Sequence, residues 1–292
     1  MRNDWFYHLV AFLVVAVWGT TFISTKVLIL HGLTPAQIFT VRFIIAYALL
    51  LAVDHKRFRS DSWRDEGLLA LLGVSGGSLY FLSENAALTY TNATNVSIIV
   101  CSCPLFAAIM LGIFYKSERL DSRACVGSLM ALVGMAIVVL NGHFVLRLSP
   151  RGDALAFVAC LCWAVYSLLM KPVGDRYSSS FITRKVFFYG LLTIGFYFLL
   201  RPDELRLPVE VLKRPAVWGN LLYLGCIASM LCYLVWTWVM KKLGAVRATN
   251  WVYFNPITTM IAAAIVLDER ITPFFLAGAV LILLGLYVAS KR

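Results

Sequence analysis

Two stretches, Trp18-Gly-Thr-Thr-Phe-Ile-Ser-Thr-Lys26 and Trp163-Ala-Val-Tyr-Ser-Leu-Leu-Met-Lys171, decide the fold of this chain. In each, a lysine follows a tryptophan by eight residues within an apolar segment, and the two stretches lie 145 positions apart in a chain of 292 residues. A cation in an apolar helix costs about 2.5–3.5 kcal/mol at the bilayer centre and less toward the interface. The same costly arrangement at the same relative position indicates a duplicated unit rather than coincidence.

The composition identifies lipid as the solvent for much of the chain. Hydrophobic residues make up 61% and charged residues 14%, with a mean hydropathy of +0.81. A soluble domain carries about a quarter charged residues to cover its surface. We also expect no cleavable signal peptide, because the first apolar stretch, about 23 residues long, exceeds a signal-peptide core.

Hydropathy predicts an all-α integral membrane protein with ten transmembrane helices. The expected spans are residues 7–30, 35–53, 67–90, 93–114, 122–140, 153–171, 181–200, 217–240, 247–266 and 273–290. The first two are separated only by His31-Gly-Leu-Thr-Pro35, in which Gly and Pro end one helix and begin the next. No connection is long enough to form a soluble domain.

The charge distribution predicts the topology. With the N-terminus inside, the cytoplasmic connections carry 15 Lys and Arg residues and the other side carries 7. The positive-inside rule then places both termini in the cytoplasm. We expect a multi-pass protein of a bacterial inner (cell) membrane. This bias accounts for the net charge of +11, and anionic lipid headgroups suffice as its partner without a nucleic acid.

The repeat extends well beyond the two lysines, through further residues matched at offsets of 151 or 152. The matches are Gly73 with Gly225, Pro104 with Pro256, Glu118-Arg119 with Glu269-Arg270, and Gly127 and Gly134 with Gly278 and Gly285. Small residues seven positions apart let helices pack closely in lipid. Each unit contains five spans, so the second unit, residues 146–292, enters the membrane inverted relative to the first, residues 1–145.

Together these features resemble the drug/metabolite transporter superfamily, in particular its ten-helix EamA-type branch. The matching residues are Trp18-Gly19, Lys26, Thr34-Pro35, Arg42, Ala86-Ala87-Leu88, Tyr90, Pro104, Glu118-Arg119 and Glu269-Arg270. The second unit departs from the pattern, since Ala164 follows Trp163 and Lys185 lies roughly where Arg42 would. The resemblance implies a secondary transporter, often an exporter of amino acids or related metabolites. It does not fix the substrate, since members of the superfamily also move aromatic compounds, cations and sugar phosphates.

Helical spacing predicts a polar, aromatic-lined cavity between the two units. The expected substrate-binding residues are Trp18, Thr21, Thr25, Tyr80, Glu84, Trp163, Tyr166, Tyr233, Trp236, Asn250, Tyr253 and Asn255. The alternative is that these Tyr and Trp side chains pack helices together or form interfacial belts.

Five charged residues are expected within the membrane: Lys26, Arg42, Glu84, Lys171 and Lys185. We favour an ion pair of Glu84 with Arg42 or Lys26. An unpaired carboxylate in an apolar medium favours its protonated form, so Glu84 is also a candidate proton carrier, or a ligand for a substrate ammonium. For Lys171 and Lys185, snorkelling toward the interface is the alternative to a functional role.

Taken with these features, the resemblance therefore implies an alternating-access exporter of a small organic metabolite, an amino acid or related zwitterion. An importer or exchanger of another solute, such as a choline-like cation or a sugar phosphate, stays open, as do the coupling ion and the oligomeric state. We expect no cofactor, metal site or catalytic residue. An intramembrane enzyme would need His, Asp or Ser clustered on facing helices, and no such pattern is visible.

Overall fold

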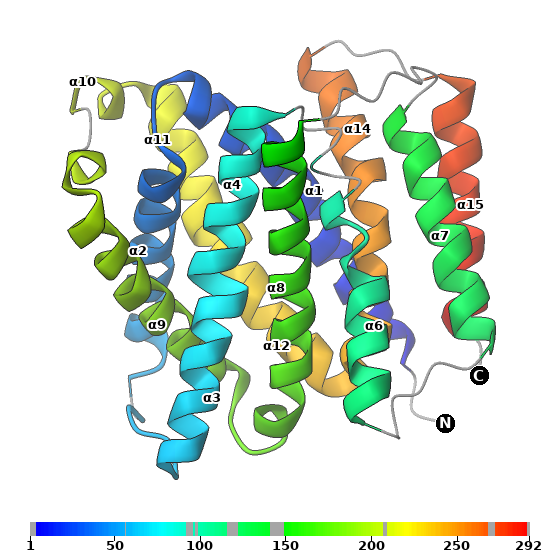
Figure 1. The fold of residues 1–292 in the computed structure, drawn as a ribbon, viewed down its shortest axis with the longest axis horizontal. Helices are drawn as coiled ribbons and strands as arrows, with labels where there is room; N and C mark the ends of the chain where they lie inside the picture. The colour runs from blue at the N-terminus through cyan, green and yellow to red at the C-terminus, as the bar shows by residue number, and fades with distance from the viewer. Residues whose placement is uncertain are drawn as a thin grey trace.

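A computed structural model describes residues 4–55, 57–91, 96, 99–115, 122–140, 149–206, 209–267 and 272–290. These residues form helices, and no strand occurs among them (Figure 1). The first half contains α1 Trp5–Leu30, α2 Pro35–Val53, α3 Trp63–Gly73, η1 Val74–Leu79, α4 Tyr80–Tyr90, α6 Cys103–Phe114 and α7 Ser122–Leu140. The second contains α8 Pro150–Gly174, α9 Ser179–Leu200, η3 Pro202–Leu205, α10 Val209–Leu212, α11 Pro215–Leu222, η4 Tyr223–Leu231, α12 Cys232–Leu243, α13 Ala245–Thr249, η5 Asn250–Phe254, α14 Asn255–Leu267 and α15 Pro273–Ser290.

These helices confirm the all-α membrane fold. In the described part of the chain, six helical segments are long and apolar enough to cross a membrane, and α6, α7 and α15 are shorter apolar helices. Large apolar side chains cover the outer surface, among them Leu13, Ile113 and Leu200, which are 53%, 73% and 81% exposed. Such a surface would be unstable in water and is the one expected against lipid tails.

The two halves run through the bundle in opposite directions. In Figure 1, α1 begins at the lower edge and α8 begins at the upper edge, and the described chain starts and ends at the lower edge. Asp4, at the start of α1, pairs with Arg247 at 3.3 Å, and Arg176, just after α8, pairs with Asp65 near the start of α3. We call the end that carries these four residues the N-terminal end, and the other the opposite end.

The matched glycines Gly127, Gly134, Gly278 and Gly285 lie where α7 and α15 pack against each other. A Cβ atom on Gly127 would lie 2.4 Å from the backbone nitrogen of Ala289, and one on Gly285 would lie 2.5 Å from that of Ala131. These distances are too short for any side chain, so only glycine permits this approach. The close packing predicted from the spacing of the glycines is confirmed.

Breaks in four membrane segments were not predicted. Spans 67–90 and 217–240 each contain a π-helical turn, η1 and η4, where an uninterrupted α-helix was expected. Span 247–266 contains the 3₁₀ turn η5, and α6 begins only at Cys103, after a turn at residues 101–102. Pro104 and Pro256 explain the last two breaks, since proline lacks an N–H group and favours the first turn of a helix.

Candidate functional site

A small cavity lies between the two halves, at the level of Trp18 in the middle of α1 and Trp163 in the middle of α8. Its free space, about 40 Å³, holds a few water molecules and no amino acid. The structure is therefore a constricted form of the site. The lining residues are Trp18, Thr21, Phe22, Arg42, Tyr80, Phe81, Glu84, Val100, Cys103, Trp163, Tyr233, Val252 and Asn255.

Most of this lining consists of residues related by the repeat. The pairs are Trp18 with Trp163, at an offset of 145, and Phe81 with Tyr233, Val100 with Val252 and Cys103 with Asn255, each at an offset of 152. Equivalent side chains from the two halves thus meet around one space. A site on the pseudo-symmetry axis can be opened toward either side by related movements of the two halves.

The two π-helical turns orient the aromatic side chains of the cavity. Trp18 Nε1 donates to the carbonyl oxygen of Ala228 in η4 at 2.9 Å, and the Tyr233 hydroxyl donates to that of Gly76 in η1 at 2.5 Å. Gly76 and Ala228 are also 152 positions apart. A π-helical turn interrupts the regular helical hydrogen bonds and leaves carbonyl oxygens free to accept from side chains, which is why such turns are frequent at functional sites.

Trp18 and Trp163 contact each other in the wall of the cavity. Their ring centroids are 5.5 Å apart with the ring planes at 90°, an edge-to-face contact. Trp163 Nε1 is buried and has no hydrogen-bond partner among the described residues, and the same holds for Asn255 Oδ1. A donor and an acceptor therefore lie buried and unused in the cavity wall, where a polar ligand could bind them.

Arg42 and Glu84 are the charged groups of the cavity. Arg42 Nε donates to Ser229 Oγ at 2.8 Å, and its guanidinium lies 4.4 Å from the centre of the Phe81 ring. Glu84 Oε1 accepts from the Tyr80 hydroxyl at 2.8 Å. Both charged side chains are buried, with relative exposures of 2% and 8%.

The ion pair predicted for Glu84 is not formed. Neither Arg42 nor Lys26 joins it among the ion pairs of the described residues. Tyr80, one helical turn before Glu84, donates a hydrogen bond to one carboxylate oxygen of Glu84. Arg42 instead donates to Ser229, which lies in η4. Arg42 and Glu84 nevertheless line the same cavity.

The three predicted lysines lie outside the cavity. Lys26 Nζ donates to the carbonyl oxygen of Leu88 at 3.2 Å, and Lys171 Nζ lies 4.7 Å from the centre of the Tyr115 ring. Lys185 pairs with Glu66 near the N-terminal end. Lys185 therefore does not take the place of Arg42 in the second half.

Five of the predicted substrate-binding residues also fall outside the lining: Thr25, Tyr166, Trp236, Asn250 and Tyr253. All are buried, and Asn250 lines a different pocket near the N-terminal end. In their place the structure brings apolar side chains into the wall, namely Phe22, Phe81, Val100, Cys103 and Val252. The prediction selected polar and aromatic faces of ideal helices. Phe81, Val100, Cys103 and Val252 belong to the broken segments, whereas Phe22, Thr25 and Tyr166 lie on the continuous helices α1 and α8.

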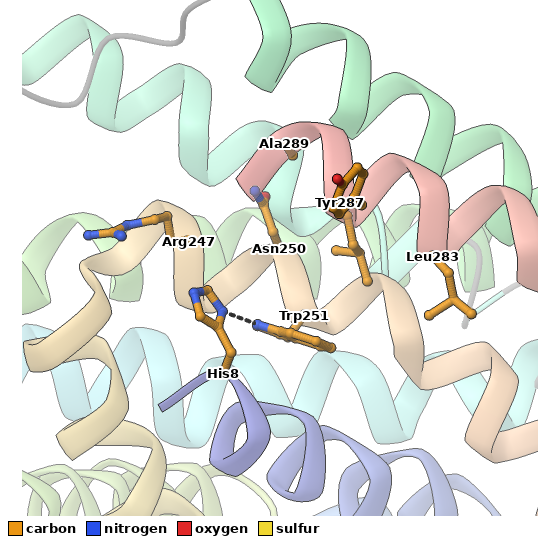
Figure 2. A pocket seen from close by; sticks show the side chains of 8 residues that line it. His8, Arg247, Asn250, Trp251, Leu283, Tyr287 and Ala289 are labelled. Atoms are coloured by element: carbon orange, nitrogen blue, oxygen red, sulfur yellow. Dashed lines mark hydrogen bonds between the residues drawn. The ribbon is translucent and has the colours of Figure 1, made fainter. Parts of the chain in front are cut away.

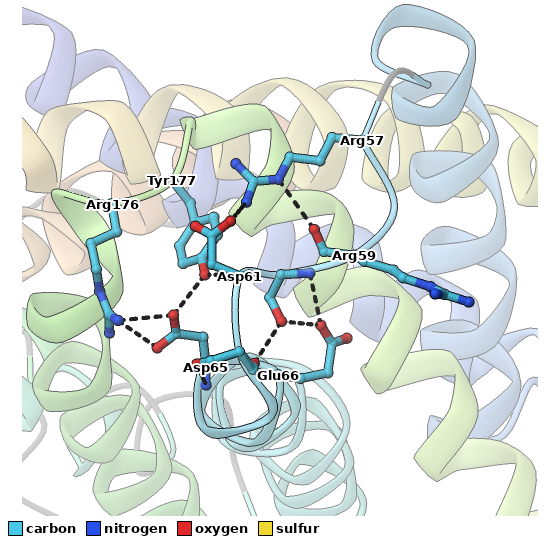
Figure 3. Close-up of polar contacts among 9 residues, drawn as sticks. Arg57, Arg59, Asp61, Asp65, Glu66, Arg176 and Tyr177 are labelled. Carbon is cyan, nitrogen blue, oxygen red and sulfur yellow. Dashed lines mark hydrogen bonds and ion pairs between the residues drawn. The ribbon is translucent and has the colours of Figure 1, made fainter.

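A polar network joins the two halves at the N-terminal end (Figure 3). Asp65 accepts from the Tyr177 hydroxyl at 2.6 Å and pairs with Arg176 at 2.6 Å. Glu66 accepts from Lys185, Tyr189 and Ser60. Arg184 pairs with Asp54 at 3.6 Å. These contacts link residues 54–66 of the first half to residues 176–189 of the second.

Comparisons with known proteins agree with this architecture. The model of the EamA-like transporter family matches the chain twice, at residues 5–140 and 150–291. A protein of Archaeoglobus fulgidus named "uncharacterized transporter" is 29% identical over 98% of this chain and 97% of its own length. A protein of Escherichia coli K12 named "probable amino-acid metabolite efflux pump" is 26% identical over 95% and 92%. A crystal structure with 18% identity shares the fold, with a TM-score of 0.73 over 97% of both chains. The protein is thus a small-molecule transporter of the membrane rather than an enzyme, and the chain belongs to the EamA-like transporter family.

Proposed function

We propose that this protein exports an amino acid or a related zwitterion by alternating access. The observation that carries the proposal is the joint presence of Arg42 and Glu84 in one aromatic-lined cavity between the halves. The name of the Escherichia coli relative, an amino-acid metabolite efflux pump, supports the same substrate class. The moving halves would be residues 1–145 and 146–292, whose boundary lies outside the described residues.

Arg42 and Glu84 each keep hydrogen-bonding capacity for a ligand. The terminal nitrogens of Arg42 and Glu84 Oε2 have no hydrogen-bond partner in the described part of the chain. A substrate carboxylate would bind the guanidinium, where two parallel N–H groups match its geometry, and a substrate ammonium would bind Glu84. A zwitterion satisfies both charges at once, which neither a choline-like cation nor a sugar phosphate does.

Binding requires Trp18 and Trp163 to separate, because the present space holds only water. Their rings would then lie beside the substrate side chain. With the N-terminal end in the cytoplasm, as the charge count predicts, the network around Asp65 and Glu66 would close the cytoplasmic side. Opening this network while closing the opposite end would move the substrate across the membrane.

The test is transport by the purified protein in proteoliposomes, with an amino-acid panel, choline and a sugar phosphate, with and without a pH gradient. We expect transport of zwitterionic amino acids, and a loss of apparent affinity in Arg42→Gln for amino acids but not for their decarboxylated amines. Lys213→Gln, at an exposed position of the opposite end, is the control. Transport of only choline or only the sugar phosphate would refute the proposal.

Coupling to protons is a second part of the proposal, with Glu84 as the carrier. Glu84 is the carboxylate in the lining of the cavity, so substrate and proton would compete for, or share, one site. If so, transport follows the pH gradient.

A further inference from the structure

A second pocket lies near the N-terminal end, between α1, the turn η5 and α15 (Figure 2). Its free space is about 220 Å³, several times that of the central cavity. His8, Arg247 and Asn250 provide polar groups, and Leu283 and Leu286 provide apolar surface. The proposed transport cycle assigns no role to this pocket.

The polar groups of the pocket have a defined hydrogen-bonding character. Trp251 Nε1, which can only donate, donates to His8 Nδ1 at 3.0 Å. His8 is therefore neutral, with its proton on Nε2, and that nitrogen is a donor. Arg247 uses one N–H group on Asp4 at 3.3 Å, and its remaining N–H groups donate to no residue in the described part of the chain.

Asn250 adds an acceptor without a partner. Its side chain is 6% exposed, and its Oδ1 is buried with no hydrogen bond in the described structure. A buried acceptor without a donor carries an uncompensated desolvation penalty. A ligand that donates to it removes this penalty, which adds to the free energy of binding. The pocket thus contains two donors that can bind an anionic group, Arg247 and His8, and one acceptor, Asn250 Oδ1, that can bind an N–H or O–H group of the same ligand.

The pocket is polar at one end and apolar at the other. In Figure 2, Arg247 and Leu283 lie at opposite ends, with Asn250 and Tyr287 between them. Leu283 lies six residues before Ala289 on α15, about 9 Å deeper in the membrane by helix rise. Leu283 and Tyr287 are 50% and 57% exposed, and in a membrane this exposed apolar surface of α15 would face lipid. The pocket therefore opens sideways into the bilayer, with its charged end toward the membrane surface.

We propose that this pocket binds a membrane phospholipid whose headgroup carries a hydrogen-bond donor. The phosphate would bind Arg247 and His8 Nε2–H, and the ammonium of an ethanolamine or a hydroxyl of a glycerol headgroup would donate to Asn250 Oδ1. The upper part of an acyl chain would lie along Leu283 and Leu286. A choline headgroup has no N–H or O–H donor and leaves Asn250 unsatisfied. Basic pockets between transmembrane helices are typical sites for phospholipid headgroups.

The test is the stabilisation of the purified full-length protein in detergent by short-chain phospholipids. The probes are dioctanoyl phosphatidylethanolamine, phosphatidylglycerol and phosphatidylcholine, with inorganic phosphate as a ligand that lacks acyl chains. We expect the first two to raise the unfolding temperature at concentrations about tenfold or more below those needed for phosphatidylcholine, the difference expected when a buried acceptor is satisfied rather than left without a donor. Inorganic phosphate should have no effect.

Two variants locate the site. Asn250→Ala should abolish the preference over phosphatidylcholine, and Arg247→Gln should weaken the binding of all three lipids. The matched controls at the opposite end, Asn220→Ala and Arg214→Gln, should behave as the unmodified protein does. Equal stabilisation of the unmodified protein by phosphatidylcholine would overturn the proposal without reliance on any variant. Stabilisation by inorganic phosphate alone would also overturn it, because the pocket would then bind a free anion.

Discussion

The pair between Lys185 and Glu66 provides a direct test of whether the polar network holds the cavity shut at the N-terminal end. Lys185 lies on α9 of the second half and Glu66 on α3 of the first, and their side chains are 11% and 19% exposed. Because the pair joins the halves, it stabilises the closed arrangement and not one in which these helices separate. We expect removal of either partner to increase the fraction of molecules that are open at this end.

Glu66→Gln should destabilise the closed arrangement more than Lys185→Met does. Glu66 also accepts from Ser60 N at 3.2 Å, from Ser60 Oγ at 2.6 Å and from the Tyr189 hydroxyl, so Lys185→Met leaves a carboxylate that keeps three donors. Glu66→Gln instead leaves a largely buried ammonium without its carboxylate. Removing one partner of a fully buried pair costs about 3–5 kcal/mol, and partial exposure reduces this to about 2–3 kcal/mol for Glu66→Gln and about 1 kcal/mol for Lys185→Met.

These values convert into populations that can be measured. At about 1.4 kcal/mol per factor of ten, Lys185→Met should raise the open fraction about fivefold and Glu66→Gln about thirtyfold or more. The reporter is Ser167→Cys in a variant whose seven cysteines are replaced. Ser167 is fully buried on α8, one turn from Trp163 toward the N-terminal end. The rate at which an impermeant thiol reagent labels it from that side should increase in the same order.

A matched control is available at the opposite end. Lys213 and Glu210 also form a lysine–carboxylate pair, but their side chains are 66% and 85% exposed. Exposed pairs contribute about 0.2–1 kcal/mol at most, so Lys213→Met should leave the labelling of Ser167→Cys unchanged. If Glu66→Gln and Lys185→Met also leave it unchanged, or if Lys213→Met increases it equally, the network does not close this end.

Three further predictions concern packing, coupling and topology. Gly76→Ala places a Cβ 2.2 Å from the fully buried ring of Tyr166, so thermal unfolding should show a loss of about 1–3 kcal/mol, and unchanged stability would contradict the packing of η1 against α8. Glu84→Gln should retain substrate exchange in proteoliposomes but lose accumulation driven by a pH gradient; retained accumulation would exclude Glu84 as the proton carrier. Single cysteines at Ser60 and Ser149 should be labelled from opposite sides of the membrane, and labelling from one side would contradict the inverted arrangement.

Much of the fold could be predicted because lipid imposes simple constraints on sequence. Predicted spans 35–53, 122–140 and 273–290 coincide with α2, α7 and α15. A membrane segment must form its backbone hydrogen bonds internally, because lipid provides no partners. A long apolar stretch therefore forms an α-helix. Close packing of α7 on α15 also followed from sequence, since only glycines at matched spacing allow two backbones to approach so closely.

The candidate site was less predictable, because it depends on contacts between distant parts of the chain. The π-helical turns η1 and η4 carry no proline, and they change which residues face the cavity. Phe81 lines the cavity. Trp236, which was expected there from ideal helical spacing, is not among the lining residues. Similarly, Glu66 was assigned to the connection at residues 54–66, and its pairing with Lys185 spans 119 positions. One feature of the sequence does indicate this pairing. The acidic pair Asp65-Glu66 and the basic pair Arg184-Lys185 both lie at the ends of spans expected on the same side of the membrane.

The matches predicted at Glu118-Arg119 and Glu269-Arg270 lie outside the described residues.

The repeat makes the two ends of the bundle alike in backbone but not in chemistry. Asp65, at the N-terminal end, corresponds at an offset of 152 to Val217 at the opposite end. Tyr177 and Leu33 are each the third residue of equivalent four-residue connections, between α8 and α9 and between α1 and α2. Where Asp65 and Tyr177 share a hydrogen bond, Val217 and Leu33 belong to one buried apolar cluster.

Different forces therefore act at these equivalent positions of the two ends. Contacts among charged groups weaken as salt screens them, whereas apolar contacts do not depend on screening. The charged contacts also require specific partners at fixed geometry, so they separate once those partners move, while apolar side chains can slide and repack. An inverted repeat with identical ends would favour neither conformation. We infer that charge in place of apolar surface at these positions would bias which side of the cavity stays closed when no substrate is bound.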